Sequence, residues 1–277
     1  MKISIITSAF NAAATIERTI RSVLQEKQGS ASVEYVVIDG GSTDGTLEII
    51  NKYKDEIDVL RSGPDDGIFD GMNRGLKECT GEIIGILNAD DEFVPGVLDR
   101  VLEVAPKAEK HFVIYGGLIW REGDQVIGAS PSELFDPSKT RPYEMPVAHP
   151  ATFVSKGCYD DFGLFDCAFP DCADRDLILR LCRNEVKFVE CPYYLTAMEK
   201  NGSSHVNFGR TQKDILKVVE RWGGTREDIE TAEKLYSDQC RRMRMQSSKN
   251  PILSLLRGIK RHFLVRRLTR EGVLPFS

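Results

Sequence analysis

The sequence predicts an α/β fold, with a mostly parallel sheet that carries helices on both faces and with a helical C-terminal extension. Strand-like apolar segments alternate with amphipathic helical segments as far as residue 105, which is the pattern of a parallel sheet. The 277 residues are 41% apolar and 29% charged, as expected for a globular chain with a sizeable core. Helical patterns follow residue 205, so we expect a body of residues 1–205 and an extension of residues 206–277.

The alternating region is expected to contain strands separated by helices. Short apolar runs bounded by polar residues predict strands at 3–7, 33–38, 59–61 and 83–87. Apolar residues at helical spacing predict the helices between them, namely Ile16, Ile20, Val23 and Leu24 in the first, Leu47, Ile50 and Tyr53 in the second, and Ile68, Met72 and Leu76 in the third. Asn11 is expected to cap the first helix, because its side chain can accept a hydrogen bond from a backbone N–H.

The alternation ends after residue 105. Residues 113–120 and 125–128 predict a hairpin around Glu122-Gly123-Asp124. Residues 130–148 are rich in proline, serine and charge, and predict a loop over a cleft.

Three more helices are predicted, at residues 173–184, 207–222 and 225–246, with Thr225 capping the last of them. The first should bury Leu177, Ile178, Leu181 and Cys182. Its start is unusually acidic, with aspartates at 166, 171, 174 and 176. Carboxylates favour the positive end of a helix dipole, but four exceed what capping requires.

The strand at 83–87 is followed by Asn88, and two adjacent carboxylates, Asp90 and Asp91, come next. Open α/β sheets bind ligands beyond the carboxyl ends of such strands. Two close carboxylates repel each other unless a cation lies between them, and Mg²⁺ or Mn²⁺ held together with substrate phosphates would satisfy both. The alternative is that Asp91 caps a helix beginning near Pro95.

The glycine-rich turn at 40–45 has neither the G-x-G-x-x-G spacing of dinucleotide-binding proteins nor the lysine of a P-loop. Asp39, at the end of the preceding strand, could accept hydrogen bonds from a base or a ribose. Alternatively, Asp39 caps the turn.

The net charge of −5 argues against general nucleic-acid binding, but the charges are unevenly distributed. Ten of the 37 Lys and Arg residues lie in 241–270, which has no Asp or Glu, so the rest carries 27 basic against 42 acidic residues. Such a basic tail on an acidic body suggests an anionic partner.

Seven cysteines without a CxxC pair predict reduced, mostly buried thiols rather than a zinc site. Asn11 and Glu17 interrupt the first apolar segment too early for a signal peptide, and no apolar run is long enough to span a bilayer. We expect a cytoplasmic protein.

Six segments in order resemble family 2 of the nucleotide-sugar glycosyltransferases, a large inverting family with the GT-A fold. They are ISIITSAFN (3–11), VVIDGGSTDGT (36–46), PDDGIFDGMNRG (64–75), GEIIGILNADD (81–91), HPATF (149–153) and FDCAFPDCADRDLILR (165–180). The third segment is similar to that of bacterial enzymes that assemble surface polysaccharides and O-antigen-like glycans.

The resemblance implies a donor site. Ser8 and Phe10 would contact a uracil, Asp39 would accept its N3–H, and Asp65 would approach the nucleotide. Asp90 and Asp91 would hold Mn²⁺ or Mg²⁺ against the diphosphate. Position 88 is Asn where the commoner D-x-D-D form has Asp, and Asn88 could bind the ribose or a metal-bound water.

The resemblance also implies a catalytic base in the segment ADRDLILR (173–180), where Asp174 takes the role and Asp176 is the competitor. Inverting transfer needs one carboxylate that removes the acceptor hydroxyl proton. Arg180 is expected to be an ion-pair partner. His149 begins an acceptor-side loop or packs in the core, and His205 lies in a segment that could close over the diphosphate.

Residues 249–270 predict a basic amphipathic helix, with Ile252, Leu255, Leu256, Ile259 and Phe263 on one face. We expect it to dock on the anionic inner face of the cell membrane, beside a polyprenyl-diphosphate-linked glycan acceptor. The alternative is packing on the body or on a second subunit.

Two other functions are considered, a sugar nucleotidyltransferase and a non-catalytic nucleotide-binding scaffold. The first lacks its Gly- and Arg-rich loop here, and the second would not need Asp174.

Overall fold

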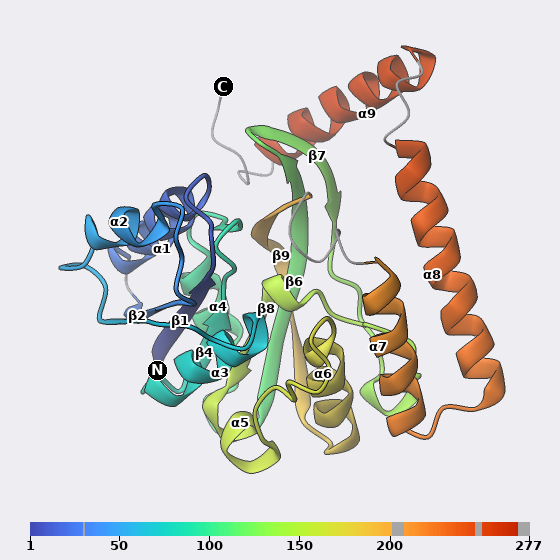
Figure 1. The fold of residues 1–277 in the computed structure, drawn as a ribbon, viewed down its shortest axis with the longest axis horizontal. Coiled ribbons are helices and arrows are strands. Elements are labelled where there is room, and N and C mark those ends of the chain that lie inside the picture. Colours follow the sequence, from blue (N-terminus) through green and yellow to red (C-terminus); the bar gives the residue numbers. More distant parts are fainter. Residues whose placement is uncertain (30, 201–207, 247–250, 271–277) are drawn as a thin grey trace.

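The computed structural model describes residues 1–29, 31–200, 208–246 and 251–270; the side chains of 208–209, 239–246, 251–259 and 262 are outside the description. Within these residues a nine-stranded sheet has the order β3-β2-β1-β4-β8-β6-β9-β5, and β7 pairs with β6 (Figure 1). The strands are β1 (Lys2–Ala9), β2 (Ser32–Asp39), β3 (Val59–Ser62), β4 (Ile83–Ile86), β5 (Glu92–Phe93), β6 (Phe112–Glu122), β7 (Gln125–Ser130), β8 (Thr152–Ser155) and β9 (Lys187–Glu199). The helices are α1 (Ile16–Lys27), α2 (Thr46–Asn51), α3 (Ile68–Glu78), α4 (Val97–Val104), α5 (Lys156–Phe162), α6 (Ala173–Arg183), α7 (Phe208–Arg221), α8 (Arg226–Gln246) and α9 (Pro251–Arg270), with short 3₁₀ turns η1 (Pro137–Lys139) and η2 (His149–Ala151).

The first four predicted strands are confirmed and are mutually parallel. Ala9 lies opposite Asp39, Asp39 lies opposite Ser62, and Ile6 lies opposite Ile86. The carboxyl ends of β1 to β4 therefore meet at one edge of the sheet. The predicted hairpin is also confirmed, as β6 and β7.

The middle of the sheet differs from the expectation. Residues 152–155 do not form a loop; they form β8, which lies antiparallel between β4 and β6. The long strand β9 had no predicted counterpart, although it runs parallel to β6. Both segments are short or irregular in their apolar pattern, so only their neighbours in the sheet define them as strands.

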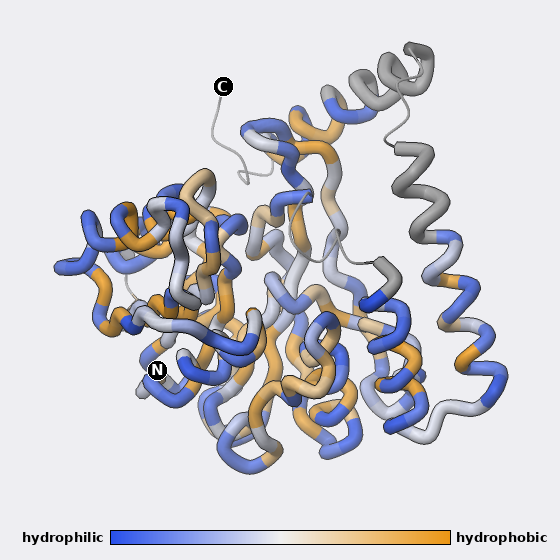
Figure 2. The backbone as a smooth tube through the Cα atoms, in the orientation of Figure 1, coloured by the Kyte–Doolittle hydropathy of each residue, from blue (hydrophilic) through white to orange (hydrophobic). Residues whose placement is uncertain are grey.

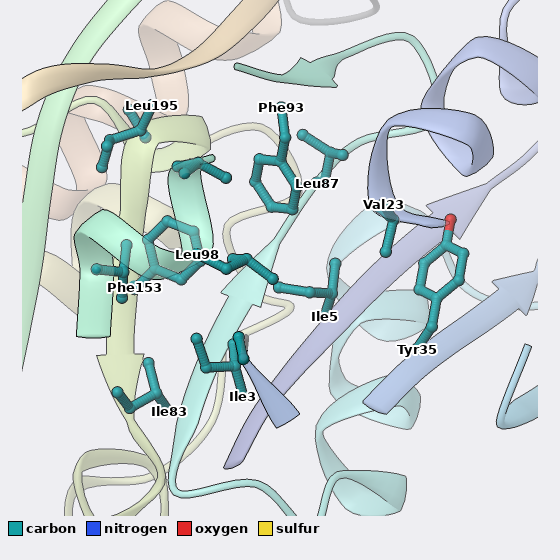
Figure 3. Packing of buried hydrophobic residues seen from close by; sticks show 14 of the residues in the cluster. Ile3, Ile5, Val23, Tyr35, Ile83, Leu87, Phe93, Leu98, Phe153 and Leu195 are labelled. Atoms are coloured by element: carbon teal, nitrogen blue, oxygen red, sulfur yellow. The ribbon is translucent and has the colours of Figure 1, made fainter. Parts of the chain in front are cut away.

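Helices cover both faces of the sheet, as predicted. Successive strand residues point to opposite faces, so Ile5 packs with α1, α2 and α4, while Ile6 packs with α3, α5 and α6. Figure 3 shows the first of these cores, in which residues from β1, β2 and β8 meet helix residues such as Val23 and Leu98. Apolar residues follow the strands and the inward sides of the helices, while α8 is largely hydrophilic (Figure 2).

Two capping expectations were wrong. Helix α1 begins at Ile16 with Thr15 as its N-cap, and Asn11 instead has a positive φ of 48° and accepts a hydrogen bond from the Thr43 N–H. Asp91 does not cap α4, because Glu26 accepts hydrogen bonds from the N–H groups at its start. The cap at Thr225 is confirmed by reciprocal hydrogen bonds with Asp228.

The described helices contain no segment long and apolar enough to cross a membrane. Six cysteines in the described part of the chain are free thiols, and five of these are buried, with Cys167 exposed.

Glu34 provides a test of the amino-terminal edge of the sheet. Burial would raise its pKa, but hydrogen bonds from Lys2, Ser4 and Thr80 outweigh this and lower the pKa to about 2. Because the folded pKa lies below the ordinary value of 4.5, ionised Glu34 stabilises the fold above about pH 4.5, and this contribution is lost as the pH falls toward about 2. We expect Glu34→Gln to lower the urea midpoint at pH 7 and to differ less from wild type at pH 3. The exposed Glu48→Gln should change neither midpoint, and an equal loss at both pH values for Glu34→Gln would contradict the assignment.

Candidate active site

Asp39 lies at the end of β2 and is 1% exposed. Its carboxylate accepts a hydrogen bond from Ser62 Oγ at 2.7 Å. The backbone N–H groups of Gly41 and Ser42 also donate to it, each at 3.3 Å. The carboxylate therefore fixes the glycine-rich turn at the sheet edge where the donor site is expected.

Asp65 lies between two glycines and beside Ser8. A Cβ at Gly40 would be 2.6 Å from Asp65 Oδ2, and a Cβ at Gly71 would collide with Ser8 Oγ. Two positions without side chains thus allow Asp65 and Ser8 to lie together beside the ends of β1 and β2. Phe10, directly after β1, is 63% exposed and is not a core residue.

Asn88, Asp90 and Asp91 form a turn directly beyond β4. Asp91 is 1% exposed; its Oδ1 accepts the Glu199 N–H at 3.0 Å, and its Oδ2 accepts Asn88 Nδ2 at 3.4 Å. Burial raises the pKa of Asp91 well above its ordinary value, and the charges of Asp90 and Glu199 raise it further, against these two hydrogen bonds. The turn therefore concentrates negative charge in a poorly solvated place.

Helix α1 holds this turn through two adjacent residues that the sequence did not single out. Arg18 donates to the Asp90 carbonyl at 3.3 Å, and Thr19 Oγ1 donates to the Asp91 carbonyl at 2.7 Å. Both contacts are to backbone oxygens, so they fix the backbone of the turn. Nothing in the local sequence pairs α1 with a turn some seventy residues later.

The same arginine joins a wider charged network. Arg18 forms ion pairs with Glu92 at 2.6 Å and with Glu199 at 3.6 Å, and Arg121 of β6 also pairs with Glu92. Burial raises the pKa of Glu92, against the attraction of the two arginines. These contacts join β5, β6 and β9 to the turn beyond β4.

The donors in the turn suit a hard divalent cation, which prefers carboxylate and carbonyl oxygens. Asn88 Oδ1 is buried and has no hydrogen-bond partner among the described residues. In the described part of the chain, no three His, Cys, Asp or Glu side chains converge as a metal cluster. A cation at Asp90 and Asp91 would therefore take further ligands from a bound diphosphate.

His149 lies beyond the carboxyl end of β4 and close to the start of α6. Gly85 of β4 lies opposite Phe153 of antiparallel β8, so η2, which precedes β8, lies beyond the carboxyl end of β4. The His149 ring meets Phe165 edge to face, with centroids 5.6 Å apart. Burial lowers the pKa of His149, and the nearby Asp174 carboxylate raises it to a lesser extent. The imidazole is thus neutral near pH 7 and close to Asp174.

Asp176 is fully engaged by the surrounding protein. It is 1% exposed, with Arg180 Nη2 at 2.5 Å from one oxygen. Trp222 Nε1 donates to the other oxygen at 3.0 Å, and Arg221 lies at 3.4 Å. Arg180 also donates to two backbone carbonyls, which agrees with a structural role.

Two more of the acidic residues before α6 pair with α7. Arg221 contacts Asp166 at 2.5 Å, and Arg210 contacts both oxygens of Asp171 at 2.5 and 2.6 Å. Asp174 is different, because within the described part of the chain its one hydrogen bond is from the Arg175 N–H at 2.8 Å. Of the four aspartates, Asp174 is the one without an ion pair among the described residues.

Arg175 ties the segment before β8 to α6. Its Nη1 donates to the Tyr143 carbonyl at 2.7 Å, and its Nε is buried without a partner in the described part of the chain. Burial lowers the Arg175 pKa, against the charge of Asp174. The loop predicted at 130–148 thus lies beside Asp174.

Asn73 of α3 is a second residue that the sequence did not single out. Its Nδ2 donates to the Phe165 carbonyl at 2.9 Å, and its Oδ1 accepts the Phe165 N–H at 3.0 Å. The Phe165 ring then contacts Phe69 and His149. This clamp sets the segment that leads into α6, and hence Asp174, against the donor side of the sheet.

The structure thus gathers most of the predicted residues along one edge of the sheet. Ser8, Phe10, Asp39 and Asp65 lie around the ends of β1 and β2, and Asn88, Asp90 and Asp91 lie beyond β4. His149, which is close to Asp174, lies beyond the same end of β4. Asp176 points into the contact with α7. His205 lies outside the described residues.

A family model described as "Glycosyl transferase family 2" matches residues 4–156. A "PGL/p-HBAD biosynthesis glycosyltransferase" of Mycobacterium bovis is 29% identical over 185 residues, which cover 65% of this chain and 70% of the relative. An uncharacterized glycosyltransferase of Mycobacterium tuberculosis, Rv1514c, is 28% identical over 214 residues, covering 75% and 80%.

Solved structures with 15–18% identity share the fold. TarS of S. aureus has a TM-score of 0.60 at 18% identity, and the match covers 83% of this chain but only 41% of TarS. The mannosyltransferase PcManGT of Pyrobaculum calidifontis, in complex with GDP-Man and Mn²⁺, has a TM-score of 0.58 at 16% identity, covering 92% and 78%. GalNAc-T7 with UDP, GalNAc and Mn²⁺ has a TM-score of 0.59 at 15% identity, covering 79% and 48%.

The Asn73 clamp can be tested through stability. Asn73→Ala removes both hydrogen bonds and leaves the Phe165 N–H and C=O buried, so we expect the free energy of unfolding to fall by about 1–3 kcal/mol. Urea denaturation would measure this. Asn184→Ala, which removes one exposed hydrogen bond to Arg180, should cost at most about 0.5 kcal/mol. Equal costs for the two variants would show that Asn73 contributes no more than a surface amide.

Proposed function

The chain belongs to glycosyl transferase family 2 and is a nucleotide-sugar glycosyltransferase with the GT-A fold, and we propose that it inverts the anomeric centre, depends on a divalent cation and adds one sugar per acceptor. The observation that carries this proposal is Asp174, which alone among the four aspartates around the start of α6 has no ion pair with the described residues, and which lies close to His149 at the end of β4 that carries the acidic turn. The proposal assigns the catalytic domain to residues 1–205 and the helical extension to residues 206–277.

The donor in this proposal is a UDP-sugar. UDP-GlcNAc is bound in a TarS structure and UDP in GalNAc-T7, whereas PcManGT binds GDP-Man. Ser8 and the exposed ring of Phe10 contact the base, since an aromatic face can stack on it. Asp39 accepts the base N3–H, and Asp65 with Asn88 and Asp90 faces the ribose and phosphates.

Asp90 and Asp91 hold Mn²⁺ or Mg²⁺ in this proposal, with Asn88 Oδ1 as a further oxygen donor. The raised pKa of Asp91 and the amide oxygen without a partner among the described residues support this assignment. A cation would stabilise the ionised carboxylate and would accept the amide oxygen as a ligand. The cation, when bound, neutralises the charge that develops on the leaving diphosphate. Arg18 and Thr19 hold the backbone of the turn and thereby position the two carboxylates for the donor.

Asp174 is the general base. The acceptor oxygen attacks the anomeric carbon, the bond from that carbon to the diphosphate oxygen breaks, and the hydroxyl proton passes to Asp174. A free carboxylate is required for this step, and Asp176 lacks one because Arg180, Arg221 and Trp222 occupy it. The neutral ring of His149 lies close to Asp174 on the acceptor side in this proposal.

The acceptor class proposed is a lipid-linked glycan, such as one on a polyprenyl diphosphate, as in synthesis of surface polysaccharide. The excess of basic residues at the C-terminus supports an anionic partner of this kind. We propose no nucleic-acid partner, because the net charge is −5. Sedimentation would show whether the protein forms a homo-oligomer. A nucleotidyltransferase is disfavoured because the chain lacks the Gly- and Arg-rich loop of that class after the first strand. A non-catalytic scaffold is disfavoured because it would not need Asp174.

The base assignment predicts that Asp174→Asn lowers acceptor-dependent release of nucleoside diphosphate by about 10²–10⁴-fold while UDP binding with Mn²⁺ stays unchanged. Calorimetry of UDP binding and a release assay would measure the two effects. Asp166→Asn, which removes only a partly exposed ion pair worth about 0.2–1 kcal/mol, should retain activity. An Asp174→Asn enzyme with wild-type turnover would refute the proposed base.

The metal assignment predicts opposite effects of Asp91→Asn with and without the cation. Removing a buried charge should raise the melting temperature of the metal-free protein. Addition of Mn²⁺ and UDP at about a hundredfold excess over Kd should raise the wild-type melting temperature by roughly 5–10 °C, but should hardly change that of Asp91→Asn. Differential scanning calorimetry measures both, with the exposed Asp160→Asn as the matched control. Full Mn²⁺-dependent stabilisation of Asp91→Asn would exclude this carboxylate as a ligand.

A further inference from the structure

Helix α9 packs on the body through one of its faces. Leu268 is fully buried in a small apolar cluster with Ile119, Val126 and Tyr194, and Leu264 and Val265 pack against the same cluster. These contacts confirm one alternative from the sequence, since the described end of the helix is seated on the catalytic domain.

Polar contacts fasten the same end. Arg261 donates to Gln125 Oε1 at the start of β7, and Arg267 donates to Tyr194 Oη at 3.1 Å. The helix therefore has a fixed orientation on the β6–β7 hairpin, as Figure 1 also shows.

A second face of α9 points away from that cluster. Phe263, Arg266 and Arg270 recur at i, i+3 and i+7, which places them on one stripe, roughly opposite the stripe of Leu264 and Leu268. Phe263 is 66% exposed, and both arginines are exposed. The sequence-predicted apolar face includes Phe263 but none of the residues that pack on the body. The side chains of its other members, Ile252, Leu255, Leu256 and Ile259, lie outside the described residues.

This outward stripe lies at the same edge of the sheet as the donor site. Strands β4 and β6 are both antiparallel to β8, so they run in the same direction, and β6 continues to Glu122 beyond the shared edge. Helix α9 covers β7, which pairs with residues 118–122 of β6. Glu199, at the end of β9, accepts the Gly123 N–H of the hairpin and donates its own N–H to Asp91. The hairpin under α9 is thus linked to the acidic turn through Glu199.

We propose that the Phe263–Arg266–Arg270 face of α9 docks on an anionic lipid bilayer and turns the donor-site edge toward it. The occupant is indicated by charge complementarity, since residues 241–270 hold ten basic and no acidic residues on a body that is otherwise acidic. An aromatic ring among arginines suits the interface between head groups and acyl chains. The inference rests on the proposed function in one respect: an acceptor anchored in the bilayer would then meet the open side of the donor site.

The test uses the full-length protein and vesicles of phosphatidylcholine, with and without phosphatidylglycerol, in a flotation assay. Wild type should float with the anionic vesicles and not with phosphatidylcholine alone, and rising salt should weaken binding. Arg266→Glu/Arg270→Glu should weaken binding by at least about tenfold, because each basic residue near such a surface strengthens it ~fivefold. Phe263→Ser should weaken it at high salt as well.

The matched control is Lys139→Glu/Arg226→Glu, which makes the same change in net charge at exposed positions away from α9. It should bind vesicles like wild type. Equal binding by the α9 variant and this control would overturn the proposal, as would wild type that ignores anionic vesicles. A dimer that sedimentation detects and Phe263→Ser dissociates would also overturn it, by assigning the face to a second copy. UDP and Mn²⁺ binding, measured on every variant, should be unchanged, so that a failure of docking is distinguished from a failure of the glycosyltransferase assignment.

Discussion

Two carboxylates at the end of a buried strand impose the main electrostatic constraint on this molecule. Unit charges about 4 Å apart near a protein surface repel by about 4 kcal/mol, and desolvation adds to that cost. The Glu199 N–H, which donates to Asp91, offsets part of this electrostatic cost. Arg18 offsets another part because it forms ion pairs with Glu92 and Glu199 next to the turn. The remaining imbalance appears as the raised pKa of Asp91. In a site of this kind the carboxylates repel each other without a cation, and a bound cation removes the repulsion. This favours the binding of a metal-diphosphate complex.

The topology of the sheet determines what can face those carboxylates. Parallel strands bring the ends of β1, β2 and β4 to one edge, which collects the residues of the donor side. One antiparallel strand, β8, reverses the chain there, so that η2 and the start of α6 approach the same edge from the other side. Asn73 then fixes the intervening segment through Phe165. Donor-side and acceptor-side groups can therefore face each other although they come from opposite halves of the sequence.

The C-terminal extension makes specific contacts with the elements around the proposed site. Arg210 and Arg221 of α7, with Trp222 directly after the helix, engage three of the four aspartates around the start of α6. Asp174 is left as the carboxylate without an ion pair among the described residues. The surplus of acid that the sequence showed before α6 is thus mainly a docking surface for α7. At the other end, α9 rests on the hairpin whose Gly123 contacts Glu199. Both ends of the extension reach elements that contact the proposed catalytic groups.

The sequence by itself determined the alternating half of the fold, the hairpin, most of the helices and the acidic turn, because each depends on local periodicity or on adjacent residues such as Asp90 and Asp91. It did not predict α5. Its six motifs in order also determined the family. Tertiary structure alone decided that β8 and β9 are strands, since their hydrogen-bond partners lie far away in the chain. It alone showed that Arg221 and Trp222, besides the nearby Arg180, engage Asp176. It alone identified Arg18 and Asn73, whose contacts span about 70 to 90 residues. Long-range pairing leaves no periodic signal in one sequence, and the availability of a carboxylate for chemistry depends on just such pairing.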